Sequence, residues 1–267
     1  MKNTFGFIGT GNMGGALARG AAKTMPSDSI FLSDGNAAKA QALADQLGCR
    51  AVSVREAAQC GYVFLGVKPQ HLGGLMKELA PVLAQRDEDF VLVSMAAGVE
   101  MADIRRLAGA DYPVIRIMPN TPAAVGSGVI LYDATENVTE EALGQFCENM
   151  KQCGFLDPLP EKLIDAGSAV SGCGPAFVAM FMEALADGGV MCGLPRDKAM
   201  AYAARTLEGT AKLLLETGNH PGQLKDAVCS PGGSTIVGVK ALEEGGMRSA
   251  AIHAVEAAYY KTKELGK

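Results

Sequence analysis

The chain has 267 residues, enough for one large domain or two modest ones. Hydrophobic residues make up 48% and charged residues 20%, which excludes an intrinsically disordered chain. The 24 Lys and Arg against 29 Asp and Glu leave a net charge of −5, which excludes bulk electrostatic attraction to nucleic acid or to an anionic membrane. Trp is absent and aromatic residues are only 6%, which disfavours an all-β sandwich.

Cysteine usage indicates the compartment. The seven cysteines form no C-x-x-C pair, and the three histidines do not complete a usual zinc spacing, so we expect no metal site. Cysteines without a pairing framework favour free thiols in a reducing compartment. Uncharged stretches are short and broken by Gly or Pro, so we expect no membrane-spanning helix. The first strand is expected to begin by Thr4, so we expect no signal peptide and a cytoplasmic protein.

The first part of the chain alternates between short apolar runs and helical stretches rich in Ala, Leu, Lys and Glu. The apolar runs are typical of buried parallel strands: Thr4–Ile8, Ile30–Ser33, Tyr62–Val67, Phe90–Ser94 and Val114–Met118. A further strand is expected at Val125–Leu131. The helical stretches are Met13–Lys23, Ala37–Leu47, Leu72–Leu83, Met101–Leu107 and Glu140–Gln152. This alternation predicts an α/β domain over residues 1–159, with a parallel sheet covered by helices on both faces.

After about Pro160 no strand runs appear. We expect helices at Pro175–Cys192, Pro195–Thr217 and Arg248–Glu264. The first of these is apolar nearly all round and must be buried on all sides. A segment of about 105 residues has little room to bury such a helix alone. We therefore predict an all-helical domain over residues 160–267 that forms a homodimer.

A glycine-rich loop follows the first strand. After Ile8, the residues Gly9, Thr10, Gly11, Asn12, Met13 and Gly14 fit the pattern G-x-G-x-x-G between a strand and a helix. Gly9 permits a tight turn, Gly11 lets backbone N–H groups reach a pyrophosphate, and Gly14 allows close packing of helix on strand. The alternative is a plain tight turn, but the context of strand, loop and helix favours a dinucleotide site.

Asp34 ends the second strand, 20 residues after Gly14. An acidic residue there usually accepts a hydrogen bond from a ribose 2′-OH and favours NADH over NADPH. An N-cap of the helix that begins at Ala37 explains it equally well. Arg50 and Arg55 are candidates to approach a 2′-phosphate, so both cofactors stay open at this point.

In a doubly wound sheet, ligands bind in a crevice at the carboxyl ends of the strands, and two further strand ends are expected to face this crevice together with the glycine loop. The segment Gly66-Val67-Lys68-Pro69 places Lys68 directly after a buried strand, either as a positive charge near cofactor or acidic substrate, or as a lysine that reaches back to water. Met95, Ala96 and Ala97 would let a flat nicotinamide ring lie against the backbone, or simply form a tight turn.

Two later loops are candidates to hold a substrate. Asn120 lies between two prolines in a stiff loop that either frames the ring site or is a rigid connector. A Pro-Gly-Gly turn then runs from Ser230 into a helix expected near Thr235. The N–H groups of Gly233, Ser234 and Thr235 would form a carboxylate-binding nest, with the Thr235 hydroxyl toward a substrate nitrogen. The alternative is an ordinary Ser/Thr N-cap.

The histidines His71, His220 and His253 are scattered, and no Ser-His-Asp, Cys-His or paired-carboxylate arrangement is present in the sequence. Hydride transfer to an already protonated C=N bond needs little acid–base help.

Several motifs in their joint order resemble the pyrroline-5-carboxylate reductase family. They are Gly6–Met13, Val67–Gln70, Ser94–Gly98, Met118–Pro122, Ala184–Val190, His220–Asp226 and, the most diagnostic, Val228–Ile236. The resemblance implies an N-terminal Rossmann domain and a C-terminal all-helical domain that interlocks with a second subunit, in dimers that commonly assemble to decamers. It implies reduction of 1-pyrroline-5-carboxylate to L-proline, the last step of proline synthesis, with NADPH slightly favoured over NADH.

The residue patterns and the resemblance together predict roles for individual residues. Cofactor contacts are expected from the glycine loop (Ile8 to Met13) and from Asp34, Ser53, Gly66, Val67, Lys68, Pro69, Met95, Ala96 and Ala97. Substrate contacts are expected from Asn120, Val228, Ser230, Gly232, Gly233, Ser234 and Thr235. Thr235, with its hydroxyl on the ring nitrogen, and Lys68 are the expected catalytic residues.

Three positions depart from the family pattern. Cys173 stands where Ser is common, Phe177 where Tyr is common, and Ser53 where Asn is frequent near the adenosine ribose. A thiol is the weaker hydrogen-bond donor, so a polar role for Cys173 is in doubt. A rival β-hydroxy-acid dehydrogenase is expected to carry a catalytic Lys in Pro175–Cys192, which has none. A reductase of a related cyclic imine, or a nucleotide sensor without catalysis, is a further alternative, and the intact Thr235 loop disfavours the sensor.

Overall fold

The computed structural model describes residues 1–265, which fold into two compact units. Unit 1 comprises Met1–Cys173 and the end of the chain from Ala257, and unit 2 comprises Gly174–Glu256. The domain boundary that the sequence predicts between residues 159 and 160 differs from this division into units and stays a prediction. By packing, the segment from residue 160 to Cys173 belongs with the sheet, because its helix lies against two strands.

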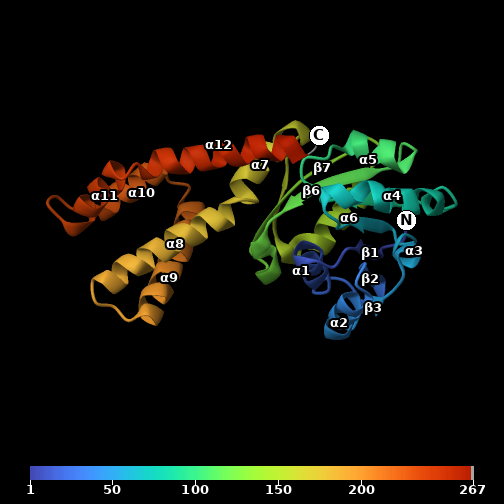
Figure 1. The fold of residues 1–267 in the computed structure, drawn as a ribbon, viewed down its shortest axis with the longest axis horizontal. Coiled ribbons are helices and arrows are strands. Elements are labelled where there is room, and N and C mark those ends of the chain that lie inside the picture. Colours follow the sequence, from blue (N-terminus) through green and yellow to red (C-terminus); the bar gives the residue numbers. More distant parts are fainter. Residues whose placement is uncertain (266–267) are drawn as a thin grey trace. The chain divides into compact units, whose positions relative to one another are not determined.

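Unit 1 is built on one eight-stranded sheet in the order β3-β2-β1-β4-β5-β6-β7-β8 (Figure 1). The strands are β1 Phe5–Ile8, β2 Ile30–Ser33, β3 Arg50–Ala51, β4 Tyr62–Leu65, β5 Val91–Ser94, β6 Val114–Pro119, β7 Gly128–Ala134 and β8 Gly154–Pro158. All neighbours are parallel except β6 and β7, which are antiparallel. The connection from β6 to β7, through a 3-10 turn at Thr121–Val125, is too short for a parallel crossover.

Helices cover both faces of this sheet. They are α1 Asn12–Ala21, α2 Ala37–Leu47, α3 Val54–Ala57, α4 Pro69–Leu83, α5 Met101–Ala108, α6 Glu140–Met150 and α7 Glu161–Ser171. One core layer packs α1, α2 and α6 against Phe5, Phe7 and Phe64, which are fully buried. The other packs α3, α4 and α5 against Val63 and Leu65 of the opposite pleat. The predicted α/β class is confirmed.

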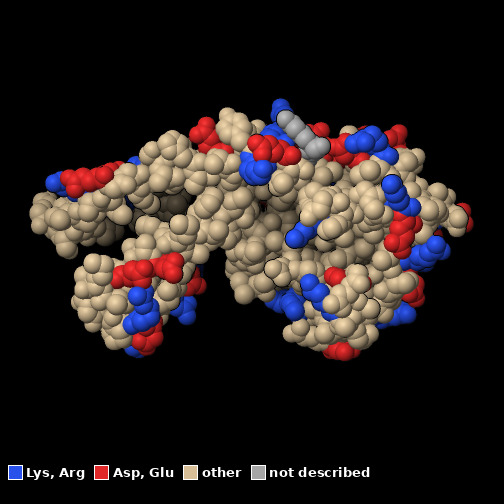
Figure 2. Space-filling view, in the orientation of Figure 1, with Lys and Arg blue, Asp and Glu red and all other residues tan. Residues whose placement is uncertain are grey.

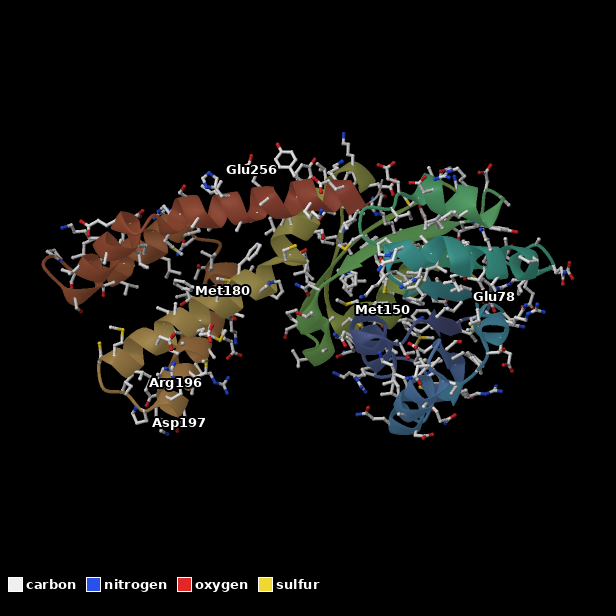
Figure 3. The ribbon with its side chains drawn as sticks, in the orientation of Figure 1. Glu78, Met150, Met180, Arg196, Asp197 and Glu256 are labelled. Carbon is white, nitrogen blue, oxygen red and sulfur yellow. The ribbon has the colours of Figure 1, made fainter. Side chains whose placement is uncertain are left out.

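Unit 2 consists of helices only: α8 Gly174–Met191, α9 Arg196–Thr217, α10 Pro221–Val228, α11 Ser234–Glu244 and the first part of α12 Met247–Leu265. Its buried apolar cluster is small and consists of Ala186, Ala199 and Ala203. Within the single chain Ala186 is the one buried residue of α8, whereas Met180 and Met191 are 71% and 89% exposed. Figure 3 labels Met180 on α8, whose charged residues are Glu183 and Asp187 alone, and Figure 2 shows acidic side chains gathered over one end of this helix. Apart from its contact with α9, the apolar helix is therefore largely uncovered within the described chain.

One helical run of the described chain, Glu161–Met191, is long and apolar enough to cross a membrane by length and composition alone. The uncharged stretches of the sequence, broken by Gly or Pro, predict no such helix, and the continuous run departs from that expectation in length and composition. Little of this run is buried within the chain. Length and composition do not distinguish a lipid-covered helix from one that a second protein copy covers.

We expect Phe64→Ala to lower the free energy of unfolding of unit 1 by about 3–5 kcal/mol, because the substitution leaves a cavity in a fully buried ring cluster. The Phe64 ring stacks on Phe7 with centroids 4.2 Å apart. Chemical denaturation followed by circular dichroism measures the change. Phe155→Ala on β8 is the control, because Phe155 is 64% exposed and its loss should cost less than about 0.5 kcal/mol. Equal costs for the two variants would contradict the core assignment.

Candidate functional site: a dinucleotide loop and a separate helix N-terminus

The glycine loop lies where the strand order reverses. Strand β1 lies between β2 and β4. The sheet continues from β2 to β3 on one side of β1, and from β4 to β5 and the later strands on the other side. The Gly9 N–H donates to the Ser33 carbonyl at 2.7 Å, and the Gly66 N–H donates to the Ile8 carbonyl at 2.7 Å. In doubly wound sheets this crevice at the carboxyl ends of the strands binds ligands.

The three motif glycines have different reasons to be glycine. Gly9 has φ +102°, and a Cβ there would lie 2.4 Å from the Gly66 carbonyl oxygen. A Cβ on Gly14 would lie 2.0 Å from the Gly9 carbonyl oxygen. A Cβ on Gly11 would meet only the Lys39 Nζ atom, at 4.0 Å. The fold itself requires Gly9 and Gly14, whereas the open space over Gly11 fits the close approach of a pyrophosphate to the backbone.

The first turn of α1 supports the same interpretation. Gly11 is its N-cap and no side chain caps this helix. Its first N–H groups and its positive dipole end are therefore available to an anion. Lys39 and Arg19 line a hollow of about 440 Å³ beside Thr10, Gly11 and Asn12. The residues present thus fit a dinucleotide phosphate.

Asp34 holds the loop from the next strand. Its Oδ2 atom accepts hydrogen bonds from the Thr10 N–H at 2.7 Å and from the Thr10 hydroxyl at 3.0 Å, and its Oδ1 atom accepts one from the Asn36 N–H at 3.0 Å. Burial raises the pKa of Asp34, but these hydrogen bonds and nearby Lys39 outweigh it and lower the pKa below its ordinary value. The alternative that Asp34 caps α2 is wrong, because Asn36 is the N-cap.

The structure brings two other predicted cofactor segments to one hollow. Lys68 is the N-cap of α4, followed by Pro69 in the first helical turn, where proline is favoured. Lys68, Pro69 and Ala97 line a hollow of about 590 Å³ at the neighbouring ends of β4 and β5. No salt bridge of Lys68 occurs within residues 1–265, so its charge is available to a ligand.

Two predicted site residues already have structural partners. The Ser53 hydroxyl and the Glu56 carboxylate form a capping box at the start of α3. The buried Asn120 side chain donates to the Ser171 carbonyl at 2.9 Å and accepts from the Val129 N–H at 2.8 Å. The fold explains both residues, and their contacts with cofactor and substrate stay predictions.

The second candidate element is the loop before α11, within unit 2. Gly232 has φ +70°, and the helix begins at Ser234 with Gly233 as its N-cap. The Gly233 N–H donates to the Ser230 carbonyl at 3.0 Å, so it already has a backbone partner in this structure, and its place in the anion nest stays a prediction. No side chain caps α11, so the alternative of an ordinary Ser/Thr cap is wrong. The N–H groups of Ser234 and Thr235 remain for a carboxylate. Val228, predicted to contact substrate, ends α10 and is 59% exposed.

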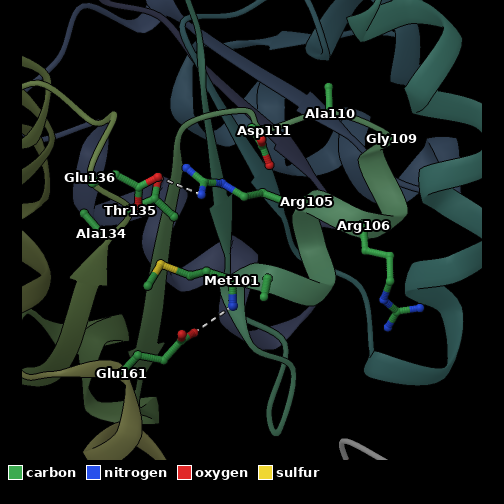
Figure 4. A pocket seen from close by; sticks show the side chains of 11 residues that line it. Met101, Arg105, Arg106, Gly109, Ala110, Asp111, Ala134, Thr135, Glu136 and Glu161 are labelled. Carbon is green, nitrogen blue, oxygen red and sulfur yellow. Dashed lines mark hydrogen bonds and ion pairs between the residues drawn. The ribbon is translucent and has the colours of Figure 1, made fainter.

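A hollow of about 780 Å³ lies along α5 and is lined mainly by polar residues (Figure 4). In it, Arg105 forms an ion pair with Glu136 and the Met101 N–H donates to Glu161. Glu161 and its buried partner Arg116 were not among the residues predicted from the sequence. One signal was present, since Arg116 interrupts the apolar run Val114–Met118. Lys39, beside the glycine loop, was also missed and had no signal beyond its place in the first turn of a helix.

Two family models match the chain. One, described as pyrroline-5-carboxylate reductase dimerisation, matches residues 161–265, and one described as NADP oxidoreductase, coenzyme F420-dependent, matches residues 4–98. The pyrroline-5-carboxylate reductase of Escherichia coli is 40% identical over the whole of both chains. That of Pisum sativum is 39% identical over 98% of this chain and 96% of its own.

Solved structures agree. Plasmodium falciparum pyrroline carboxylate reductase with NADP bound has a TM-score of 0.87 and 31% identity, and the alignment covers 100% of this chain and 99% of that one. The Coxiella burnetii pyrroline-5-carboxylate reductase has a TM-score of 0.88 and 31% identity over 99% and 98%. The doubly wound sheet, the glycine loop and these matches together define the class of the protein, a Rossmann-type, nicotinamide-dependent oxidoreductase. With relatives of 40% identity over its full length, the chain belongs to the pyrroline-5-carboxylate reductase family.

We expect Gly11→Ala and Gly14→Ala to fail in different ways. Gly11→Ala should leave the melting temperature unchanged, because its methyl group enters open space, and should weaken NADPH binding about ten- to a hundredfold by obstructing hydrogen bonds to a charged phosphate. Gly14→Ala should destabilise the protein by about 1–3 kcal/mol through overpacking. Thermal unfolding and calorimetric titration with NADPH separate the two. Unchanged NADPH affinity in Gly11→Ala would contradict the assignment of the loop.

Proposed function

We propose that the protein reduces the C=N bond of 1-pyrroline-5-carboxylate to give L-proline, with a reduced nicotinamide dinucleotide as hydride donor. The observation that carries the proposal is the 40% identity over the full length of a pyrroline-5-carboxylate reductase. The open glycine loop in unit 1 and the uncapped start of α11 in unit 2 support it, since the reaction needs a dinucleotide site and a carboxylate site.

The residues of α11 supply the substrate site in this proposal. The backbone N–H groups of Ser234 and Thr235, at the positive end of the helix dipole, hold the carboxylate. The Thr235 hydroxyl orients the ring nitrogen. The cofactor, when bound, supplies a hydride to C5 of the protonated imine, and the electron pair of the C=N bond becomes the lone pair of the amine nitrogen. Lys68, at the start of α4, adds positive charge beside the hollow proposed for the cofactor.

The proposed cofactor is NADPH. The Asp34 carboxylate already accepts three hydrogen bonds from Thr10 and Asn36, which leaves about one of its acceptor sites for a ribose hydroxyl. Lys39 lies beside Gly11 and close enough to Asp34 to lower its pKa. In this position its ammonium group could form an ion pair with a 2′-phosphate. Lys39 replaces Arg50 and Arg55 as the candidate for this contact.

The proposed assembly is a homodimer formed through the helical unit. A dimerisation model covers residues 161–265, and α8 exposes its apolar side chains within the single chain. A second copy would bury this surface, which also explains why Glu161–Met191 has the length and composition of a membrane span. Assembly to a decamer and a cytoplasmic location remain part of the proposal.

We expect Thr235→Ala to lower kcat/KM for 1-pyrroline-5-carboxylate by roughly ten- to a thousandfold, as removal of one hydrogen bond at a reacting centre does. The assay follows NADPH oxidation with racemic substrate, with NADH in parallel. Thr217→Ala on α9 is the matched control, because the Thr217 hydroxyl donates to the Leu213 carbonyl in an exposed helix. Wild-type kinetics in Thr235→Ala would contradict its role, and no turnover by the wild type would overturn the proposed reaction.

We expect Lys39→Gln to raise KM for NADPH by about three- to tenfold and to leave KM for NADH unchanged, because only NADPH carries the 2′-phosphate. Steady-state kinetics with both cofactors measure the ratio. Lys212→Gln on α9 is the control for loss of one surface charge, since Lys212 is 74% exposed. An equal change for both cofactors would place Lys39 away from the 2′-phosphate.

A further inference from the structure

Helix α5 begins without a cap of its own. Its N-cap residue is Glu100, whose side chain makes no capping hydrogen bond. The first N–H group of the helix, that of Met101, donates instead to the Glu161 Oε1 atom at 2.7 Å (Figure 4). Glu161 is the first residue of α7, 60 positions further along the chain. A carboxylate from a distant part of the chain thus accepts a hydrogen bond at the helix start, as the side chain of a local Ser, Thr or Asp usually does.

Glu161 is itself fixed by the sheet. The Arg116 guanidinium, 1% exposed, lies 3.4 Å from the Glu161 Oε1 atom and 2.6 Å from the Asp165 Oδ1 atom. The Glu161 N–H donates to the Asp133 Oδ2 atom at 2.6 Å. Arg116 and Asp133 are direct partners in the register of β6 and β7. Two neighbouring strands therefore set where the Glu161 carboxylate lies.

The position of the segment before α5 depends on the hydrogen bond between the Met101 N–H and Glu161. It runs from Met95 to Glu100 and connects β5 to α5. Inside it, the Val99 N–H donates to the Ala96 carbonyl at 3.3 Å around Gly98, whose φ is +73°. Its start is fixed by β5, and its end is fixed where Met101 meets Glu161. The same segment holds Met95, Ala96 and Ala97, the predicted neighbours of the nicotinamide ring.

We propose that Glu161, held by Arg116, is a positioning residue that keeps the Met95–Ala97 segment in the conformation that receives the nicotinamide ring. This inference rests on the proposed function, since it assigns the ring to that segment. A buried arginine is costly, and apolar residues often replace buried ion pairs without loss of stability. The network is therefore better explained by what it fixes, namely the start of α5 relative to the sheet, than by stability.

The first test is amide hydrogen exchange on the full chain without cofactor. In the wild type the Met101 amide should be protected, and Glu161→Ala should speed its exchange by about two- to thirtyfold, the factor that corresponds to loss of one helix cap. Glu161→Gln retains an oxygen acceptor and should keep Met101 protected. A Met101 amide equally protected in Glu161→Ala would overturn the proposal.

The second test separates the two halves of the cofactor. Glu161→Ala should weaken NADPH binding by up to about thirtyfold, because ordering the segment then costs at most the lost cap, and should leave the affinity for 2′,5′-ADP unchanged, because that ligand lacks nicotinamide. Its kcat should fall about ten- to a hundredfold, as expected for a displaced reactant. Glu161→Gln should restore binding and turnover toward the wild type.

Glu136→Ala is the matched control, because Glu136 is an exposed glutamate in the turn after β7, paired with Arg105 of α5, whereas the Met101 N–H donates to Glu161. Its exchange, binding and turnover should equal those of the wild type. Equal weakening of NADPH and 2′,5′-ADP in Glu161→Ala, or failure of Glu161→Gln to restore binding, would overturn the positioning role. Exchange and binding need no turnover, so they test Glu161 even if the substrate is a different imine.

Discussion

The mutual approach of two backbones at the ends of β1 and β4 is the constraint on which the site depends. A side chain on Gly9 would collide with the Gly66 carbonyl, and one on Gly66 would lie 2.6 Å from the Gly9 carbonyl. Because neither residue has a Cβ, the two loops pass each other closely and then diverge. The divergence sends α1 and α4 to opposite faces of the sheet, and the crevice lies where they part.

Within each of the two units, the candidate residues divide according to whether the fold already uses their polar groups. Ser53, Asp34 and Asn120 have polar groups with identified protein partners. Gly11 has open space above it, and the first turn of α11 has N–H groups that no side chain caps. Buried polar groups seek partners within the protein, so a ligand is expected at groups whose partners the fold does not supply. This distinction makes Gly11 and the α11 terminus stronger candidates than Ser53 and Asn120.

The sequence predicts most of the fold because its buried strands are short apolar runs of distinctive composition. The predicted range Ile30–Ser33 and the predicted helix Ala37–Leu47 coincide with β2 and α2. Strand β8 was missed because it is half-exposed and lacks a continuous apolar run, and α7 because its polar residues face the sheet as partners of Arg116. The glycine loop was predictable from local pattern. The hydrogen bond with which Glu161 caps α5 could not be predicted in this way, because only the pairing of β6 with β7 brings Glu161 close to the start of α5.

The uncovered apolar surface of α8 links folding to association. With Ala186 alone buried in that helix, the helical unit of one chain has little apolar burial of its own. Mass action then makes the stability of this unit depend on protomer concentration, whereas the sheet unit contains its own two core layers. Dilution should therefore loosen the α11 terminus while the glycine loop keeps its shape. A dilute sample would retain the proposed site for the dinucleotide after the proposed site for the carboxylate has been lost.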